Sequence, residues 1–218
     1  MKLKLLLSAF ILCFLLSGNL QAQTSTHSVK ITTDSGIIVV KLYDETPLHR
    51  DNFLKLVKEG FYDSLLFHRV IPHFMIQGGD PLSKNAPAGT MLGNGGADMQ
   101  RIPAEFRTEL IHKKGALCAA RDNNPQKASS ACQFYIVQGK PVSEDELNGT
   151  EARLGIKYTP EQREIYKSIG GTPFLDQNYT VFGEVESGLD VIDKIARMQK
   201  DGYDRPITDI KMKMEVIN

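Results

Sequence analysis

One short segment of the chain combines side chains that could bind a substrate and act on it. Within the run Phe67–Asp80, Arg69 carries a permanent positive charge, Gln77 carries an amide, and Phe74 and Met75 supply apolar surface. Alternation along a strand can send Arg69 and Gln77 to one surface together with Phe74 or Met75. An arginine on an apolar strand is costly to bury unless its charge is used. This residue therefore predicts either an ion pair with an acidic neighbour or a hydrogen-bond donor directed at a substrate.

Short strands separated by loops rich in glycine and proline must position these side chains. A helix is predicted to open at Pro47 behind Thr46 as N-cap and to end at Gly60, and a second helix is predicted over 188–197 with Ser187 as its cap. Strands are predicted over residues 29–33, 37–43, 65–70, 73–77, 115–120, 132–138, 181–185 and 210–216. Many short strands with two helices predict a mainly β fold, a closed antiparallel β-barrel capped by two α-helices.

Residues 141–171 do not fit a minimal barrel, because they are polar and helical in character. Ser143 with Glu146 matches a capping box, and Thr159 with Gln162 matches another. We expect a helical insertion between two barrel strands at about 141–171.

Length and composition predict one globular domain over residues 28–218. The 218 residues are 41% hydrophobic and 24% charged, which is typical of a soluble protein with a packed core. The formal net charge is zero and there is no long basic run, so neither nucleic acid nor an anionic membrane surface is expected as a partner.

Residues 1–22 match a secretory signal peptide. Lys2 and Lys4 precede an apolar run from Leu5 to Leu16, and small and polar residues follow before Gln23. If this segment is cleaved, we expect the mature protein not to be stably inserted in a membrane. The alternative is that the segment stays attached as a membrane anchor. Residues 23–27 are predicted to be a short disordered lead-in.

Two cysteines remain once Cys13 leaves with the signal peptide. Cys118 and Cys132 could form one disulfide in an exported protein. We favour the alternative, two small buried thiols on neighbouring strands. The five histidines are scattered and show no ligand spacing with the cysteines, so no metal or other cofactor is predicted.

Three blocks of the sequence resemble the signature of the cyclophilin family of peptidyl-prolyl cis-trans isomerases. They are Phe67–Asp80, Gly115–Arg121 with Gln133–Ile136 downstream, and Phe174–Val185. The resemblance covers residues 28–218 except for the insertion. It implies an eight-stranded cyclophilin-like barrel, isomerase activity without a cofactor, proline-containing polypeptides as substrates, and a monomer. The pattern resembles bacterial exported members, which implies protein folding in the periplasm.

The resemblance also implies a role for each residue of the site. Arg69 corresponds to the catalytic arginine, and Gln77 and Phe74 complete the catalytic group. Met75, Leu175 and Phe182 correspond, with Phe74, to walls of the proline pocket. The remaining substrate-binding positions by the same correspondence are Gly93, Ala120, Arg121, Gln133, Tyr135, Phe174 and Tyr179.

Four positions depart from the common family pattern without removing the arginine or the apolar pocket. Tyr135 stands where many members have Phe, Arg121 where eukaryotic members have Asn, and Tyr179 where they often have His. Phe174 stands where many have Trp, and the lost indole N–H donor implies weak cyclosporin binding.

Two other functions compete with isomerisation. A chaperone that holds proline-containing segments would use the same groove, although binding alone would not need the arginine donor. A hydrolase is poorly supported, because the chain has no Gly-x-Ser-x-Gly motif. Asp80 and Glu105 are predicted to be a turn residue and a salt-bridge residue.

Overall fold

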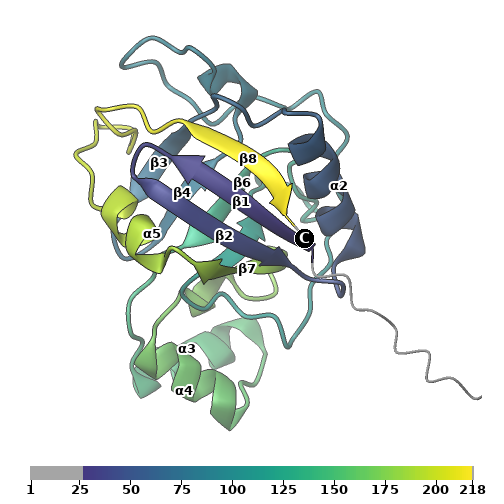
Figure 1. The fold of residues 1–218 in the computed structure, drawn as a ribbon. Helices are drawn as coiled ribbons and strands as arrows, with labels where there is room; N and C mark the ends of the chain where they lie inside the picture. The colour runs from purple at the N-terminus through teal and green to yellow at the C-terminus, as the bar shows by residue number, and fades with distance from the viewer. Residues whose placement is uncertain (1–26, 218) are drawn as a thin grey trace, which may run out of the picture.

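Residues 27–217 are described by the computed structural model, and they form a curled antiparallel sheet with helices around it (Figure 1). The strands are β1 (His27–Thr33), β2 (Gly36–Leu42), β3 (Phe67–Ile71), β4 (Met75–Gly78), β5 (Ala116–Ala119), β6 (Phe134–Val137), β7 (Val181–Ser187) and β8 (Met212–Ile217). The helices are α2 (Pro47–Lys58), α3 (Glu144–Leu154), α4 (Pro160–Ser168) and α5 (Leu189–Ala196), with short 3₁₀ turns η1 (Pro81–Ser83) and η2 (Pro173–Leu175).

The predicted signal peptide lies outside the described residues. The predicted lead-in over residues 23–27 also lies outside the described residues, except for His27. This residue belongs to β1 and pairs with Leu42 of β2. Within residues 27–217, no helix combines the length and the apolar character that crossing a bilayer requires.

The eight strands follow the order β3-β4-β6-β5-β7-β2-β1-β8. The sheet curls into a half-barrel with β3 and β8 as its two edges, so the predicted closed barrel is not confirmed. Its edges approach each other just before β3, where the Phe67 N–H donates to the Ile210 carbonyl and the Met212 N–H to the Leu65 carbonyl, each at 2.9 Å. Among residues 27–217, one isolated bridge, Leu66 to Lys211, joins the edges, and β8 beyond it pairs with β1.

The central strands bury both of their faces in different apolar cores. Along β6, Phe134 and Ile136 join the large core enclosed by the curl, whereas Tyr135 and Val137 join a smaller core on the outer face. This is the two-residue period of an extended strand. The outer face of β4, β5, β6 and β7 therefore holds its own set of buried side chains.

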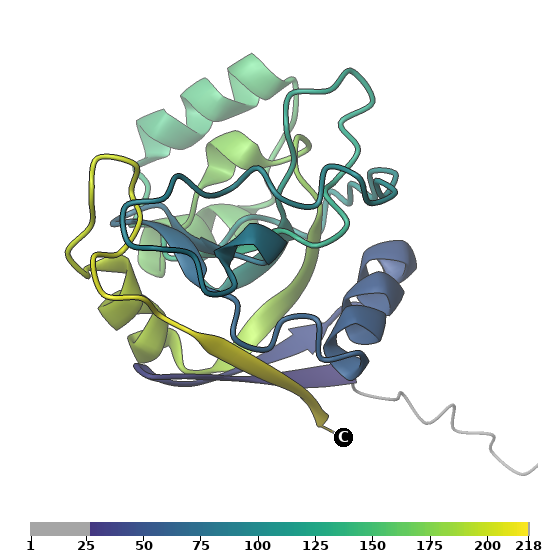
Figure 2. The same cartoon turned by 90° about the horizontal axis from the view of Figure 1, so that it is seen from above.

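Helices α2 and α5 lie at opposite ends of the curled sheet, and both pack against the large core inside it (Figure 2). The start of α2 is capped by Glu105, whose carboxylate accepts hydrogen bonds from the backbone N–H groups of Leu48 at 3.2 Å and His49 at 3.0 Å. Thr46 occupies the predicted N-cap position, but its side chain makes no capping bond. Glu105 also binds His49 Nδ1 at 2.7 Å. Because burial lowers the pKa of His49, this contact is a hydrogen bond to a neutral ring near pH 7 rather than the predicted salt bridge.

The predicted cap of α5 is wrong. Ser187 belongs to β7, and Gly188 occupies the N-cap position with a φ of 96°. The chain turns sharply there from β7 into α5, and a left-handed backbone conformation favours glycine. The turn also brings Gly188 against β2, where a Cβ would lie 2.4 Å from the Ile37 carbonyl oxygen.

The predicted insertion is helical and consists of α3 and α4, which pack together away from the main sheet (Figure 1). Both predicted capping boxes form, from Ser143 with Glu146 and from Thr159 with Gln162. The insertion has a small core of its own, formed by Ile111, Val142, Leu147, Tyr158 and Tyr166.

Cys118 and Cys132 are free buried thiols, as favoured from the sequence. Cys118 belongs to the outer core and Cys132 to the core inside the curl. The two side chains face opposite sides of the sheet, which keeps them from forming a disulfide.

We expect Glu105→Ala to lower the free energy of unfolding by about 2–4 kcal/mol, because it leaves the first-turn N–H groups of Leu48 and His49 and the buried His49 ring without their charged acceptor. Urea denaturation followed by circular dichroism measures this loss. Glu109→Ala, at an exposed glutamate whose one contact is its neighbour Thr108, is the matched control. Equal stability of the two variants would rule out Glu105 as the cap.

Candidate active site

Arg69 and Gln77 face each other across the β3–β4 pair, on the outer face of the sheet. Arg69 Nη1 donates to Gln77 Oε1 at 3.3 Å. On its other side, Arg69 Nε lies 3.8 Å from Asp204 Oδ2, and its side chain is 40% exposed. The ion pair expected from the sequence therefore exists, but at this distance it leaves guanidinium N–H groups available to a substrate.

An apolar pocket of about 110 Å³ lies beside Arg69. Its size suits one small ring, since pockets for drug-sized ligands usually exceed about 300 Å³. Tyr135 packs edge-on against Tyr179 with 6.0 Å between ring centroids. The lining residues are Arg69, Phe74, Met75, Gln77, Ala120, Arg121, Tyr135, Leu175 and Tyr179.

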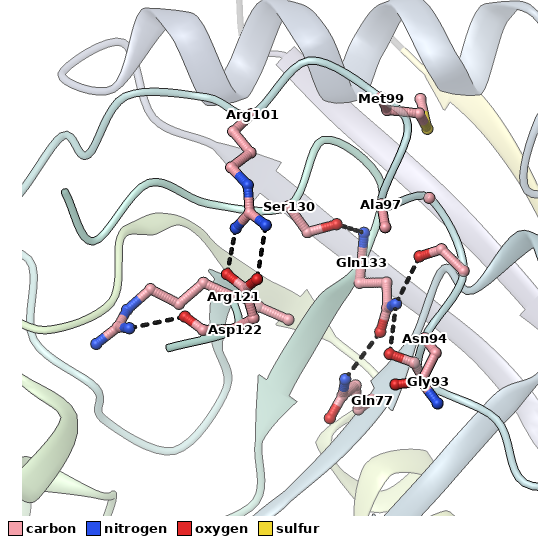
Figure 3. Close-up of a pocket in the computed structure, with 13 residues that line it drawn as sticks. Gln77, Gly93, Asn94, Ala97, Met99, Arg101, Arg121, Asp122, Ser130 and Gln133 are labelled. Carbon is pink, nitrogen blue, oxygen red and sulfur yellow. Dashed lines mark hydrogen bonds and ion pairs between the residues drawn. The ribbon is translucent and has the colours of Figure 1, made fainter. Parts of the chain in front are cut away.

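A series of hydrogen bonds between side chains runs from Arg69 to a glycine-rich loop, and Figure 3 shows its part from Gln77 through Gln133 to Gly93. Gln77 Nε2 donates to Gln133 Oε1 at 3.1 Å, and Gln133 Nε2 donates to the carbonyls of Gly93 and Gly95, both at 2.9 Å. The bond from Arg69 to Gln77 continues this series of hydrogen bonds. All donors in the series point in the same direction, so the bonds polarise one another. The amide groups are thus fixed in orientation before a substrate arrives.

Asp80 holds the loop to which this chain leads. Its carboxylate accepts hydrogen bonds from the backbone N–H groups of Leu82, at 2.8 Å, and of Gly93. It is therefore a turn residue, as predicted.

A second, larger cavity of about 390 Å³ adjoins the apolar pocket and shares Gln77, Ala120 and Arg121 with it. Arg101 and Asp122 form an ion pair on its wall (Figure 3). The guanidinium of Arg101 holds the pKa of Asp122 well below its ordinary range. An extended peptide with one side chain in the apolar pocket could place a neighbouring residue here.

The structure brings most of the predicted site residues together, with two exceptions in placement. Phe182 does not reach the apolar pocket: its ring is buried inside the curl, 5.4 Å from that of Phe53. Val181, its neighbour on β7, faces the outer core instead. Phe174 stands at the rim, 47% exposed, with its ring 5.7 Å from that of Phe74. Gly93 and Gln133 line the second cavity.

Three residues near the site were not foreseen from the sequence. Asp204 lies against Arg69, and His112 with Asp176 forms a buried pair behind Tyr135. One signal could have indicated the pair: Tyr135 adds a hydroxyl to a buried ring, and a buried hydroxyl needs a partner. Burial raises the pKa of Tyr135 well above its ordinary value.

Within residues 27–217, no group of three His, Cys, Asp or Glu side chains could hold a metal ion. The pocket offers instead a cationic donor, oriented amides and an apolar surface.

The model of the cyclophilin-type peptidyl-prolyl cis-trans isomerase family matches residues 28–216. A Staphylococcus haemolyticus protein named as a peptidyl-prolyl cis-trans isomerase is 34% identical over 194 residues, covering 88% of this chain and 91% of that protein. A Streptococcus pyogenes protein named as a bifunctional phosphatase and peptidyl-prolyl cis-trans isomerase is 38% identical over 187 residues. The match covers 84% of this chain but only 37% of that longer protein.

Solved structures share the fold at lower identity. A cyclophilin-type isomerase of Cryptosporidium parvum superposes with a TM-score of 0.64 at 22% identity, covering 88% of this chain and 98% of the other. The same protein was also crystallised in the presence of the dipeptide Ala-Pro, with a TM-score of 0.63 to this chain.

His68, next to Arg69 in β3, is expected to limit stability at acid pH. It is 3% exposed, and its burial lowers its pKa to about 4. The unfolded chain therefore binds a proton at this histidine as the pH falls below about 6.5, whereas the folded protein does not until near pH 4. We expect the free energy of unfolding to fall across this window.

Urea denaturation between pH 7 and pH 4 tests this expectation. The pH dependence should be shallower in His68→Gln than in the unaltered protein. Some dependence will remain in the variant, because burial also lowers the pKa of His49. Identical slopes for variant and unaltered protein would contradict the assignment to His68.

Proposed function

The chain belongs to the cyclophilin-type peptidyl-prolyl cis-trans isomerase family, and we propose that it accelerates X-Pro rotation in exported proteins with Arg69 as the donor to the prolyl nitrogen. The observation that carries this proposal is the position of Arg69 on the rim of an apolar pocket sized for one small ring. Crystallisation of a structural neighbour in the presence of Ala-Pro supports a proline-containing peptide as the occupant.

The reaction needs no bond cleavage and therefore no nucleophile. The barrier of about 20 kcal/mol comes from amide resonance. Twisting the bond localises a lone pair on the prolyl nitrogen, so a donor aimed at that nitrogen binds the twisted form better than the planar form. The cationic guanidinium of Arg69 lines the pocket and has more N–H donors than its bond to Gln77 uses.

The rest of the site anchors the peptide so that rotation takes place about one bond. The apolar walls hold the pyrrolidine ring and exclude water, which strengthens the interaction with the arginine. Gln77 presents an amide already oriented by Gln133, and the main chain of Ala120 and Arg121 borders both cavities.

No single contact can account for the expected rate. A 10⁵-fold acceleration requires about 7 kcal/mol of transition-state stabilisation. One charged hydrogen bond contributes about 1.5–3 kcal/mol. Desolvation of the ring and the fixed orientation of the amides must supply the remainder.

We also propose that the protein acts after export, in the periplasm, as a monomer and without stable insertion into the membrane. The support is the signal-like segment at residues 1–22, with its two lysines, apolar run and small residues before Gln23.

Arg69→Ala should lower kcat/KM for cis-to-trans conversion of a short X-Pro peptide roughly 30- to 1000-fold. The reason is the loss of a preorganised donor, which costs about 2–4 kcal/mol of transition-state stabilisation. A protease-coupled or NMR exchange assay measures the rate. Arg153→Ala, at an exposed arginine in the last turn of α3, is the control and should keep full activity. Near-normal turnover by folded Arg69→Ala would refute the role of Arg69, and an inactive unaltered protein would favour the chaperone alternative.

Expression of the full chain in a bacterium with a periplasm tests the proposed export. We expect a soluble periplasmic product whose N-terminus, determined by mass spectrometry, is Gln23. Retention of residues 1–22 on a membrane-bound product would show that the segment is an anchor instead.

A further inference from the structure

A buried polar chain connects the apolar pocket with the helical insertion. The hydroxyl of Tyr135, a wall of the pocket, lies 3.0 Å from His112 Nε2. His112 Nδ1 lies 2.6 Å from Asp176 Oδ1. Because an ionised carboxylate can only accept, His112 Nδ1 carries the proton, and in the neutral ring Nε2 is left to accept from the Tyr135 hydroxyl.

Asp176 is the centre of this chain and receives four hydrogen bonds. Oδ1 accepts from the His112 backbone N–H at 2.9 Å as well as from its ring. Oδ2 accepts from the hydroxyls of Tyr158 at 2.7 Å and Tyr166 at 2.6 Å. The Asp176 side chain is only 2% exposed. A buried carboxylate is tolerated when its oxygens are saturated with donors in this way.

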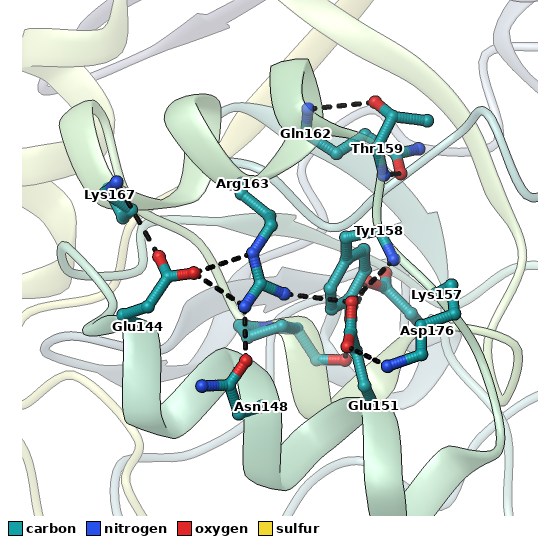
Figure 4. Close-up of polar contacts among 11 residues, drawn as sticks. Glu144, Asn148, Glu151, Lys157, Tyr158, Thr159, Gln162, Arg163, Lys167 and Asp176 are labelled. Atoms are coloured by element: carbon teal, nitrogen blue, oxygen red, sulfur yellow. Dashed lines mark hydrogen bonds and ion pairs between the residues drawn. The ribbon is translucent and has the colours of Figure 1, made fainter.

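The two oxygens of Asp176 face different parts of the fold. Tyr166 lies in α4 and Tyr158 lies in the connection between α3 and α4, so Oδ2 belongs to the insertion. Elsewhere in the insertion, Glu151 accepts from the Tyr158 backbone N–H and from Arg163, which also binds Glu144 (Figure 4). Oδ1 is connected through His112 to Tyr135, which lines the apolar pocket.

At the apolar pocket, this series of hydrogen bonds ends at Tyr135, whose position matters for substrate binding. Tyr135 pairs directly with Gln77 across β4 and β6, so the two side chains are neighbours on one face. The His112 and Tyr135 rings stack with 6.2 Å between centroids and 15° between planes. A stacked ring with a fixed hydroxyl has one orientation, whereas a phenylalanine in the same place could tilt.

We propose that Asp176 is a positioning residue through which the helical insertion holds the Tyr135 wall of the apolar pocket in its active orientation. The inference rests on the proposed function and extends it to the insertion. It predicts that a hydroxyl on α4, which touches no pocket residue directly, affects isomerisation.

Tyr166→Phe is the decisive variant, because it removes the hydroxyl that donates to Asp176 Oδ2 at 2.6 Å, whereas the Tyr158 hydroxyl also binds the Pro173 carbonyl. We expect Tyr166→Phe to lower kcat/KM roughly tenfold per folded molecule, as small displacements of a site can. Tyr135→Phe should lower it by a similar factor. The double variant should lose no more activity than either single variant, since both changes break one chain.

Two control variants separate positioning from general loss of stability. Arg163→Gln removes contacts within the insertion with Glu144 and Glu151 but none with Asp176 (Figure 4). Tyr62→Phe removes another buried hydroxyl, one that donates to the Cys132 carbonyl inside the curl. Both should reduce resistance to urea while leaving kcat/KM within twofold of that of the unaltered protein.

Aromatic NMR signals of Tyr135 give a readout that does not depend on turnover. They should shift in Tyr166→Phe and stay in place in Arg163→Gln. Unchanged kcat/KM and unchanged Tyr135 signals in Tyr166→Phe, or fully additive losses in the double variant, would overturn the inference. If the unaltered protein does not isomerise X-Pro bonds, the proposed function fails, and the Tyr135 signals alone decide whether Asp176 transmits the position of the insertion.

Discussion

Burial of both faces of the central strands is the constraint on which the rest of this structure depends. Along β5, β6 and the first residues of β4 and β7, successive buried side chains alternate between the core inside the curl and the core on the outer face. The inner core, with aromatic rings of Phe53 and Phe134 in edge contact, holds the sheet in its curved shape. The outer face then presents Met75, Gln77 and Tyr135 at fixed spacing. A rigid site follows from the pleat of the strands rather than from the loops.

Buried carboxylates act in this protein as acceptors that fix loops and helix ends. Glu105 accepts from the first turn of α2, Asp80 from η1 and the glycine-rich loop, and Asp176 from His112 and the insertion. Each of them saturates donors that would otherwise be costly to bury. None faces the apolar pocket as an acid or base, in keeping with a reaction that moves no proton.

The family and the geometry agree on the kind of chemistry. An isomerase of X-Pro bonds needs a cationic donor, an apolar seat for one ring and an anchored backbone, and the pocket beside Arg69 combines these groups. The helical insertion is tied to this pocket, because its buried tyrosines contact the carboxylate behind Tyr135. The hydroxyl that Tyr135 adds to the common phenylalanine pattern forms the pocket end of that chain.

The sequence by itself determined the strands, the insertion helices with their capping boxes, and the shared surface of Arg69 and Gln77, because these follow from local periodicity and turn chemistry. It could not assign Phe182 to a core, since β7 has apolar residues on both faces there and periodicity then gives no direction. The open edge between β3 and β8 and the partners of Tyr135 were also decided by tertiary structure. His112 and Asp176 are 64 residues apart, and only the folded chain brings such distant polar groups together where burial forces them to pair.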